Sequence, residues 1–147
     1  MNKINRQYKS IIQIDLVEAN QLIESAMEES NQLGLNIAVA IVDTGGHLIA
    51  FNRSENAGFL TVDAAINKAW TASSFGHPTH TWNELFNDSK LAPLSNIPRM
   101  LAVGGGYPII HDEKIIGAIG ISGGSYTEDQ HIAEYALKNL NNNIKDI

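Results

Sequence analysis

Residues 101–125 read LAVGGGYPIIHDEKIIGAIGISGGS, a stretch in which apolar, often β-branched runs alternate with glycines and one acidic pair. Runs of this length and composition, bounded by turn residues, are typical of strands. Gly104–Gly106 separates the first run from the second, and Asp112-Glu113 supplies the turn before the third. We therefore expect three strands, at residues 100–103, 107–110 and 114–122.

Two further strands are expected before this stretch. Residues 36–43 are almost wholly apolar, and residues 47–51 resume an extended pattern after the turn residues Thr44–Gly46. Two such runs joined by a glycine-containing turn predict a hairpin. Because the first run lacks polar alternation, we expect both of its faces to be covered, which places it centrally in the sheet. Asp43 is interpreted as a turn residue that bonds its own backbone.

The remaining segments carry helix patterns. Asp15, with Glu18 three residues later, predicts the start of a first helix, and Gly34 suits the residue just past its end. Apolar and small residues at helical spacing predict a second helix around residues 62–70.

Two later helices are predicted from capping boxes, in which Ser or Thr is followed three residues later by Glu or Gln. The sequence TWNE at residues 81–84 would cap a short helix that carries Leu85 and Phe86 inward, and Thr127 would cap the last helix. The order α-β-β-α-α-β-β-β-α favours an α+β fold with an antiparallel sheet of about five strands. We expect one domain over residues 1–147, with flexible ends at 1–12 and 142–147.

Composition excludes several classes of function. The chain has 147 residues, a formal net charge of −6 and no cysteine, which rules out a disulfide framework, a thiolate nucleophile and a zinc–thiolate site. Basic residues are scattered, so no nucleic-acid partner is expected. No apolar run has the roughly 20 residues that span a bilayer, so no membrane association is expected. The polar start resembles no secretory signal, and we expect a cytoplasmic protein.

A glycine-rich loop is the strongest candidate for ligand binding on physical grounds. Ser122, Gly123, Gly124 and Ser125 follow the last expected strand and lead into the helix expected to be capped by Thr127. Converging backbone N–H groups and the positive end of a helix favour a carboxylate. Alternatively, the two glycines only supply the positive φ that the turn needs. The loop is neither a Walker A motif nor a dinucleotide fingerprint, so no nucleotide is expected.

Several motifs, taken in order and spacing, resemble the GlcG/HbpS family, which includes the C-terminal domain of PduO-type proteins. The resemblance covers about residues 35–140. It is carried by VDTGGHL at 42–48, Arg53, KAWTA at 68–72, GGGYPI at 104–109, IGAIGISGG at 116–124, and Asp129 ahead of Ile132-Ala133. It implies a profilin-like α+β fold, a bacterial source, homo-oligomers, and haem binding or degradation in several members.

If haem binds, its axial ligand must be His, Met or Tyr, because cysteine is absent. Tyr107 and His131, which lies in the first turn of the last helix, are candidates. In haem-binding members a histidine of the first helix is a proposed ligand, and this chain has no histidine before His47. Either another residue holds haem here, or this member does not bind it. His77, His80 and Glu84 form a weak candidate metal set, because Pro78 lies inside the motif.

The basic residues within the matched motifs, Arg53 and Lys68, would pair either with an anionic ligand or with Asp43 or Asp129 in structural salt bridges. Gly104, Gly105 and Gly106 would either allow a ligand to approach or form a bend between strands.

These observations leave three candidate functions. The favoured one is a binding protein for haem or a related anionic cofactor. The others are an accessory protein or enzyme for a small carboxylate or aldehyde in glycerol, propanediol or glycolate use, and a structural oligomer.

Overall fold

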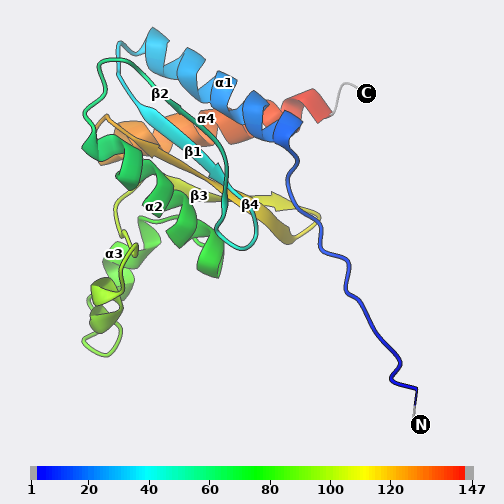
Figure 1. The fold of residues 1–147 in the computed structure, drawn as a ribbon. Coiled ribbons are helices and arrows are strands. Elements are labelled where there is room, and N and C mark those ends of the chain that lie inside the picture. Colours follow the sequence, from blue (N-terminus) through cyan, green and yellow to red (C-terminus); the bar gives the residue numbers. More distant parts are fainter. Residues whose placement is uncertain (1–2, 145–147) are drawn as a thin grey trace.

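A computed structural model describes residues 3–144 and shows an antiparallel sheet between helices (Figure 1). In chain order the elements are α1 (Leu16–Gln32), β1 (Ala38–Val42), β2 (Leu48–Arg53), α2 (Leu60–Phe75), α3 (Thr81–Leu85), a 3-10 helix η1 (Ala92–Asn96), β3 (Gly106–His111), β4 (Lys114–Ser122) and α4 (Tyr126–Ile144). The α+β class with an antiparallel sheet is therefore confirmed. The ends at 1–2 and 145–147, which belong to the segments expected to be flexible, lie outside the described residues.

The sheet has four strands in the order β2-β1-β4-β3, one fewer than expected. Residues 100–103 do not form a strand, because the side chains of two threonines, one in α2 and one in the turn before α3, bind this stretch and its flank instead. The Thr71 hydroxyl donates to Arg99 O (3.1 Å) and accepts from Leu101 N (3.0 Å). The Thr79 hydroxyl donates to Val103 O at 2.6 Å. Backbone groups that bind side chains are not available to a strand ladder.

Helices cover both faces of the sheet. Helices α1 and α4 pack on one face over a core of isoleucines that includes Ile41, Ile119 and Ile121. Helix α2 packs on the other face, where Ala65, Ala69 and other alanines meet small residues of β1 and β4. Each residue of β1 is fully buried, which confirms its predicted central position.

The small contact residues let α2 approach the sheet closely. A Cβ atom added at Gly120 of β4 would press against the carbonyl oxygen of Ala65 and lie 2.7 Å from Ala69 N. Gly120 is therefore a packing requirement of the α2–β4 contact.

The helix ends match the sequence predictions only in part. Asp15 caps α1 as expected, since its Oδ1 accepts from Glu18 N at 2.8 Å, and Gly34 has the expected positive φ of 69°. The prediction for α4 was wrong, because this helix begins at Tyr126 and the residue that caps it is Ser125. A hydroxyl can satisfy the free N–H groups only from a position before the first turn, which excludes Thr127.

The predicted cap of α3 was also wrong. This helix begins at Thr81 itself, and no side chain caps it. Trp82 is its buried residue, while Leu85 and Phe86, which were expected to point inward, are half-buried. Over the described residues, no helix is both long and apolar enough to cross a membrane.

Replacement of Gly120 by alanine tests the close α2–β4 contact. We expect Gly120→Ala to lower the free energy of unfolding by about 1–3 kcal/mol, because the methyl group has no room against α2. Gly58→Ala is the matched control, since nothing lies within 4 Å of a Cβ at that position. Urea unfolding measures both, and equal midpoints for the two variants would contradict the packing argument.

Candidate functional site

One end of the sheet gathers most of the predicted ligand-binding residues. Ser122, at the end of β4, pairs with Ala38 of β1, which pairs with Arg53 of β2. Gly106, at the start of β3, pairs with Gly120 of β4. The glycine-rich loop, the Gly104–Gly106 run and Arg53 therefore lie at the same end of the sheet. Arg53 is exposed, and its guanidinium donates to Ala57 O at 2.7 Å.

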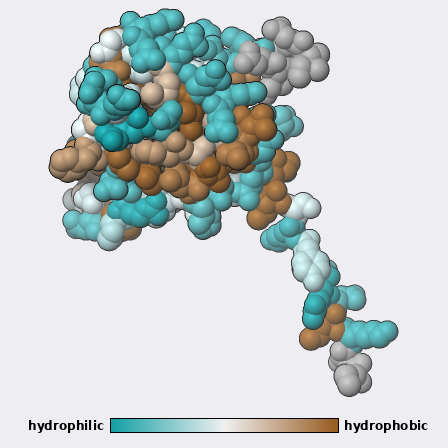
Figure 2. All heavy atoms as spheres, turned by 45° about the horizontal axis from the view of Figure 1, so that its top comes forward, coloured by the Kyte–Doolittle hydropathy of each residue, from teal (hydrophilic) through white to brown (hydrophobic). Residues whose placement is uncertain are grey.

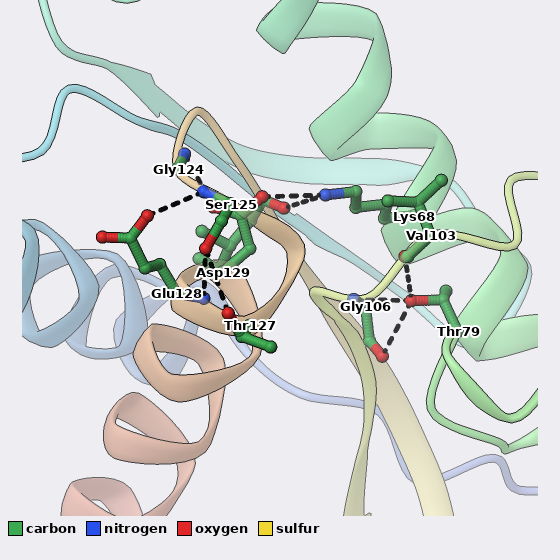
Figure 3. A network of polar contacts seen from close by, with 10 residues as sticks. Lys68, Thr79, Val103, Gly106, Gly124, Ser125, Thr127, Glu128 and Asp129 are labelled. Atoms are coloured by element: carbon green, nitrogen blue, oxygen red, sulfur yellow. Dashed lines mark hydrogen bonds and ion pairs between the residues drawn. The ribbon is translucent and has the colours of Figure 1, made fainter.

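A buried ion pair lies at this end (Figure 3). Lys68 Nζ from α2 lies 3.0 Å from Asp129 Oδ2 of α4 and donates to Ile121 O at 2.8 Å. Each side chain is only 3% exposed. Burial raises the pKa of the Asp129 carboxyl, against the lowering effect of the Lys68 ammonium and of the Gly124 N–H. Lys68 therefore pairs with Asp129 within the chain, which is one of the two alternatives its sequence position allowed.

Two glycines of the Gly104–Gly106 run lie against the residues of this pair. A Cβ at Gly105, whose φ is 124°, would lie 2.8 Å from Asp129 Cβ and 3.1 Å from Lys68 Nζ. A Cβ at Gly106 would lie 2.9 Å from the carbonyl carbon of Lys68. The glycines thus leave room for the protein's own ion pair and for the α2 backbone. A ligand at the pair would have to displace this backbone.

The Ser122–Thr127 loop also uses its N–H groups within the chain. Gly124 N donates to Asp129 Oδ1 at 2.9 Å, and Ser125 N donates to Glu128 Oε1 at 2.9 Å (Figure 3). The Ser125 hydroxyl in turn accepts from Glu128 N at 3.2 Å, which completes a capping box. Two carboxylates of the protein therefore take the place at the helix start that one of the two sequence interpretations assigned to an external anion. An external carboxylate would have to displace Glu128, the less buried of the two.

Two residues considered as axial ligands bind carboxylates elsewhere. The Tyr107 hydroxyl donates to Glu134 Oε1 at 2.5 Å, and desolvation together with this carboxylate raises the pKa of the phenol. Tyrosine ligates haem iron as tyrosinate, which this environment disfavours. His131 Nε2 lies 2.8 Å from Glu29 Oε1, so the imidazole links α4 to α1.

The weak metal candidates do not converge. The ring of His77 packs against Trp82 at 6.3 Å, whereas the ring of His80 packs against Tyr107 at 5.8 Å. Within residues 3–144, no group of three His, Asp or Glu side chains could hold a metal ion. His80 Nδ1 and Trp82 Nε1 are buried without a hydrogen-bond partner in the described part of the chain.

A histidine at the opposite end of the sheet is oriented by a carboxylate, which the sequence interpretation missed. In the β1–β2 turn, His47 Nδ1 lies 3.1 Å and 3.2 Å from the two oxygens of Asp43, and the His47 side chain is 81% exposed. Asp43 Oδ1 also accepts from Gly45 N (2.9 Å) and His47 N (3.0 Å), which agrees with its predicted turn role. The spacing of four residues across a Gly-Gly turn is the signal that points to this pair.

The two glycines of the turn explain its geometry. A Cβ at Gly45 would lie 2.8 Å from His47 Cε1, so glycine leaves room for the imidazole to fold back onto Asp43. A Cβ at Gly46, where φ is 79°, would lie 2.7 Å from Trp70 Cδ1. The turn therefore packs on Trp70 while it presents His47 to solvent.

A family model and several known proteins match this α+β domain over most of its length. The family model described as "Haem degrading protein HbpS-like" matches residues 14–138. An uncharacterised 15.0 kDa protein of Citrobacter freundii, from the dhaT–dhaS intergenic region, is 30% identical over 132 residues, which cover 88% of this chain and 93% of that protein.

Solved structures agree with the family match. Klebsiella pneumoniae protein ORFY superimposes with a TM-score of 0.88 at 28% identity, over 95% of this chain and 98% of that one. A PduOC–haem complex superimposes with a TM-score of 0.80 at 29% identity, over 86% of this chain and 94% of that one. The chain belongs to the HbpS-like family, as its motifs predicted.

Removal of one partner of the buried ion pair tests its structural role. We expect Lys68→Met to lower the free energy of unfolding by about 3–5 kcal/mol, because it leaves the Asp129 carboxylate buried and unpaired. Lys68→Met combined with Asp129→Asn should lose less than Lys68→Met alone, since an amide oxygen can still accept from Gly124 N. Urea unfolding of the double-mutant cycle measures the coupling. Purely additive effects would contradict it. Lys90→Met, at an exposed position, is the control.

The Asp43 hydrogen bonds predict a pH effect. Desolvation alone would raise the pKa of Asp43. The hydrogen bonds from the backbone N–H groups of His47 and Gly45 and from the imidazole together outweigh desolvation, so the pKa lies below the usual 3.8. The unfolded chain therefore binds the proton more readily, so the stability that Asp43 contributes is present above about pH 5 and falls as the pH drops through the folded pKa. The stability advantage of wild type over Asp43→Asn should shrink between pH 5 and pH 2.5 in urea titrations. An advantage that grows toward low pH would contradict this sign.

Proposed function

We propose that this protein binds haem or a closely related anionic tetrapyrrole. The observation that carries the proposal is the similarity to the PduOC–haem complex over 86% of this chain, together with the family description. Haem supplies an iron with axial coordination positions and two carboxylates, and the protein must supply a ligand and a surface.

His47 is the residue that best fits the role of axial ligand. Of the two neutral tautomers of His47, the one that donates from Nδ1 to Asp43 leaves the lone pair of Nε2 for iron. A carboxylate behind a ligating histidine also fixes the ring and increases its basicity. By contrast, His131 directs its Nε2 at Glu29.

The surface beside this turn suits the rest of a haem. Trp70 is half-buried under the turn, and the guanidinium of Arg99 lies 4.9 Å from the centroid of its ring. Leu48, which follows His47, is 47% exposed. An apolar ring system can pack on such side chains, and a guanidinium pairs well with a propionate.

A hemin titration with matched histidine variants tests the proposal. Wild type should show a saturable, red-shifted Soret band near one equivalent, and His47→Ala should lose that shift. Asp43→Asn should weaken binding by about 10–100-fold, because it removes the group that orients the ligand. His111→Ala is the control, since this histidine is also exposed at a turn and lies beside Asp112.

The outcomes distinguish a failure of haem binding from a wrong choice of axial ligand. A wild-type spectrum identical to that of free hemin would overturn haem binding itself. A normal shift in His47→Ala together with loss in another histidine variant would overturn only the choice of His47.

A further inference from the structure

The N-terminal arm, defined as residues 3–12, extends away from the body of the domain (Figures 1 and 2). It carries apolar side chains that the domain leaves in solvent: Ile4 is 87% exposed, Tyr8 83%, Ile11 68% and Ile12 54%. Ten extended residues reach about 33 Å, at roughly 3.3 Å each. An exposed series of large apolar side chains marks an interaction surface.

The root of the arm is fixed to the sheet. Ile14 N donates to Ile116 O at 2.9 Å, and Gln13 Oε1 accepts from both the backbone N–H and the hydroxyl of Thr44. Ile14 is 5% exposed and belongs to the core. The point at which the arm leaves the body is therefore fixed by one backbone hydrogen bond to β4, by the Gln13–Thr44 contacts and by the burial of Ile14.

The charge of the arm is opposite to that of the body. Residues 3–12 contain Lys3, Arg6 and Lys9, three of the ten basic residues of the chain, and none of the sixteen acidic ones. The rest of the chain holds seven basic and sixteen acidic residues, a formal charge of −9. Another copy of this chain is thus an electrostatically suitable surface for the arm.

A groove of about 490 Å³ lies beside the arm root. Its apolar walls come from the edge strand β3, from β4 and from the second half of α4. Asp15 and Glu18 are also among its lining residues and supply two carboxylates. In Figure 2, apolar residues gather where the arm leaves the body. The groove therefore matches the arm in both apolar character and charge.

We propose that the arm of one copy occupies this groove on a second copy, and that the exchange is reciprocal. Because the arm root and the groove adjoin, a two-fold axis near Ile12 would place each arm over the groove of its partner. A two-fold contact of this kind closes on itself and gives a discrete dimer.

The arm's own groove is a poor alternative. The arm passes its own groove at Ile12 and leads away from it, so filling the groove would require a reversal of the chain. Residues 3–12 contain neither glycine nor proline, the residues that most favour tight reversals. A second copy needs no reversal.

Mass measurement of paired variants by light scattering tests the exchange. Wild type should have at least twice the mass of one chain. Tyr8→Asp with Ile11→Asp in the arm, or Ile110→Asp in the groove, should raise the dissociation constant by about tenfold or more, because each removes apolar burial. Phe59→Asp is the control, since Phe59 is 90% exposed on α2's N-terminal side.

A mixture of the arm variant and the groove variant discriminates further. The arm variant keeps an intact groove, and the groove variant keeps an intact arm. In a mixed dimer the intact arm can occupy the intact groove, so one of the two contacts is restored and part of the dimer should be recovered. A monomeric wild type at tens of micromolar would overturn the proposal. So would an arm variant that keeps the wild-type mass, or a mixture that shows no recovery. Circular dichroism identifies a variant that fails to fold, in which case the same comparison uses Ile11→Ser and Ile110→Ser.

Discussion

The buried ion pair between Lys68 and Asp129 constrains the rest of this structure. It joins helices on opposite faces of the sheet, because Lys68 comes from α2 and Asp129 from α4. Two charges can be buried only where further hydrogen bonds satisfy them, and here Ile121 O and Gly124 N do so. The glycines at 105 and 106 follow from the same requirement, since a side chain at 105 would collide with the pair and one at 106 with the backbone of α2.

Because the ion pair and its hydrogen bonds fill one end of the sheet, the proposed ligand site lies at the other end. The loop after β4 has the composition of an anion site, but Asp129 and Glu128 already accept from its N–H groups. The β1–β2 turn presents His47 outward instead, with Asp43 behind the imidazole. The root of the N-terminal arm binds the same turn through Gln13 and Thr44. A second copy held by the arms would therefore sit near the surface proposed for haem.

The sequence predicted most of the architecture, because strands and helix starts are set by local patterns. The central position of β1 followed from its apolar run, and the Asp15 cap of α1 from its spacing. The stretch 100–103 was wrongly expected to be a strand, since its backbone binds the hydroxyls of Thr71 and Thr79, which lie 30 and 24 positions before their partners. Local patterns cannot show such partners.

The site was less predictable for the same reason. Lys68 and Asp129 are 61 residues apart, and only the folded chain brings them together. The orientation of His47 depends on space that Gly45 leaves for a ring two residues away, which composition does not reveal. The family match and the residue motifs agreed on the fold, while the proposal of His47 as a ligand rests on the geometry of the β1–β2 turn.

Paramagnetic broadening of amide resonances by substoichiometric ferric hemin tests the central claim most directly, because broadening falls steeply with distance from the iron. The account predicts that the amides of residues 43–48 broaden first, followed by those near Trp70 and Arg99. Broadening centred on residues 122–127, or uniform weak broadening across the domain, would contradict it.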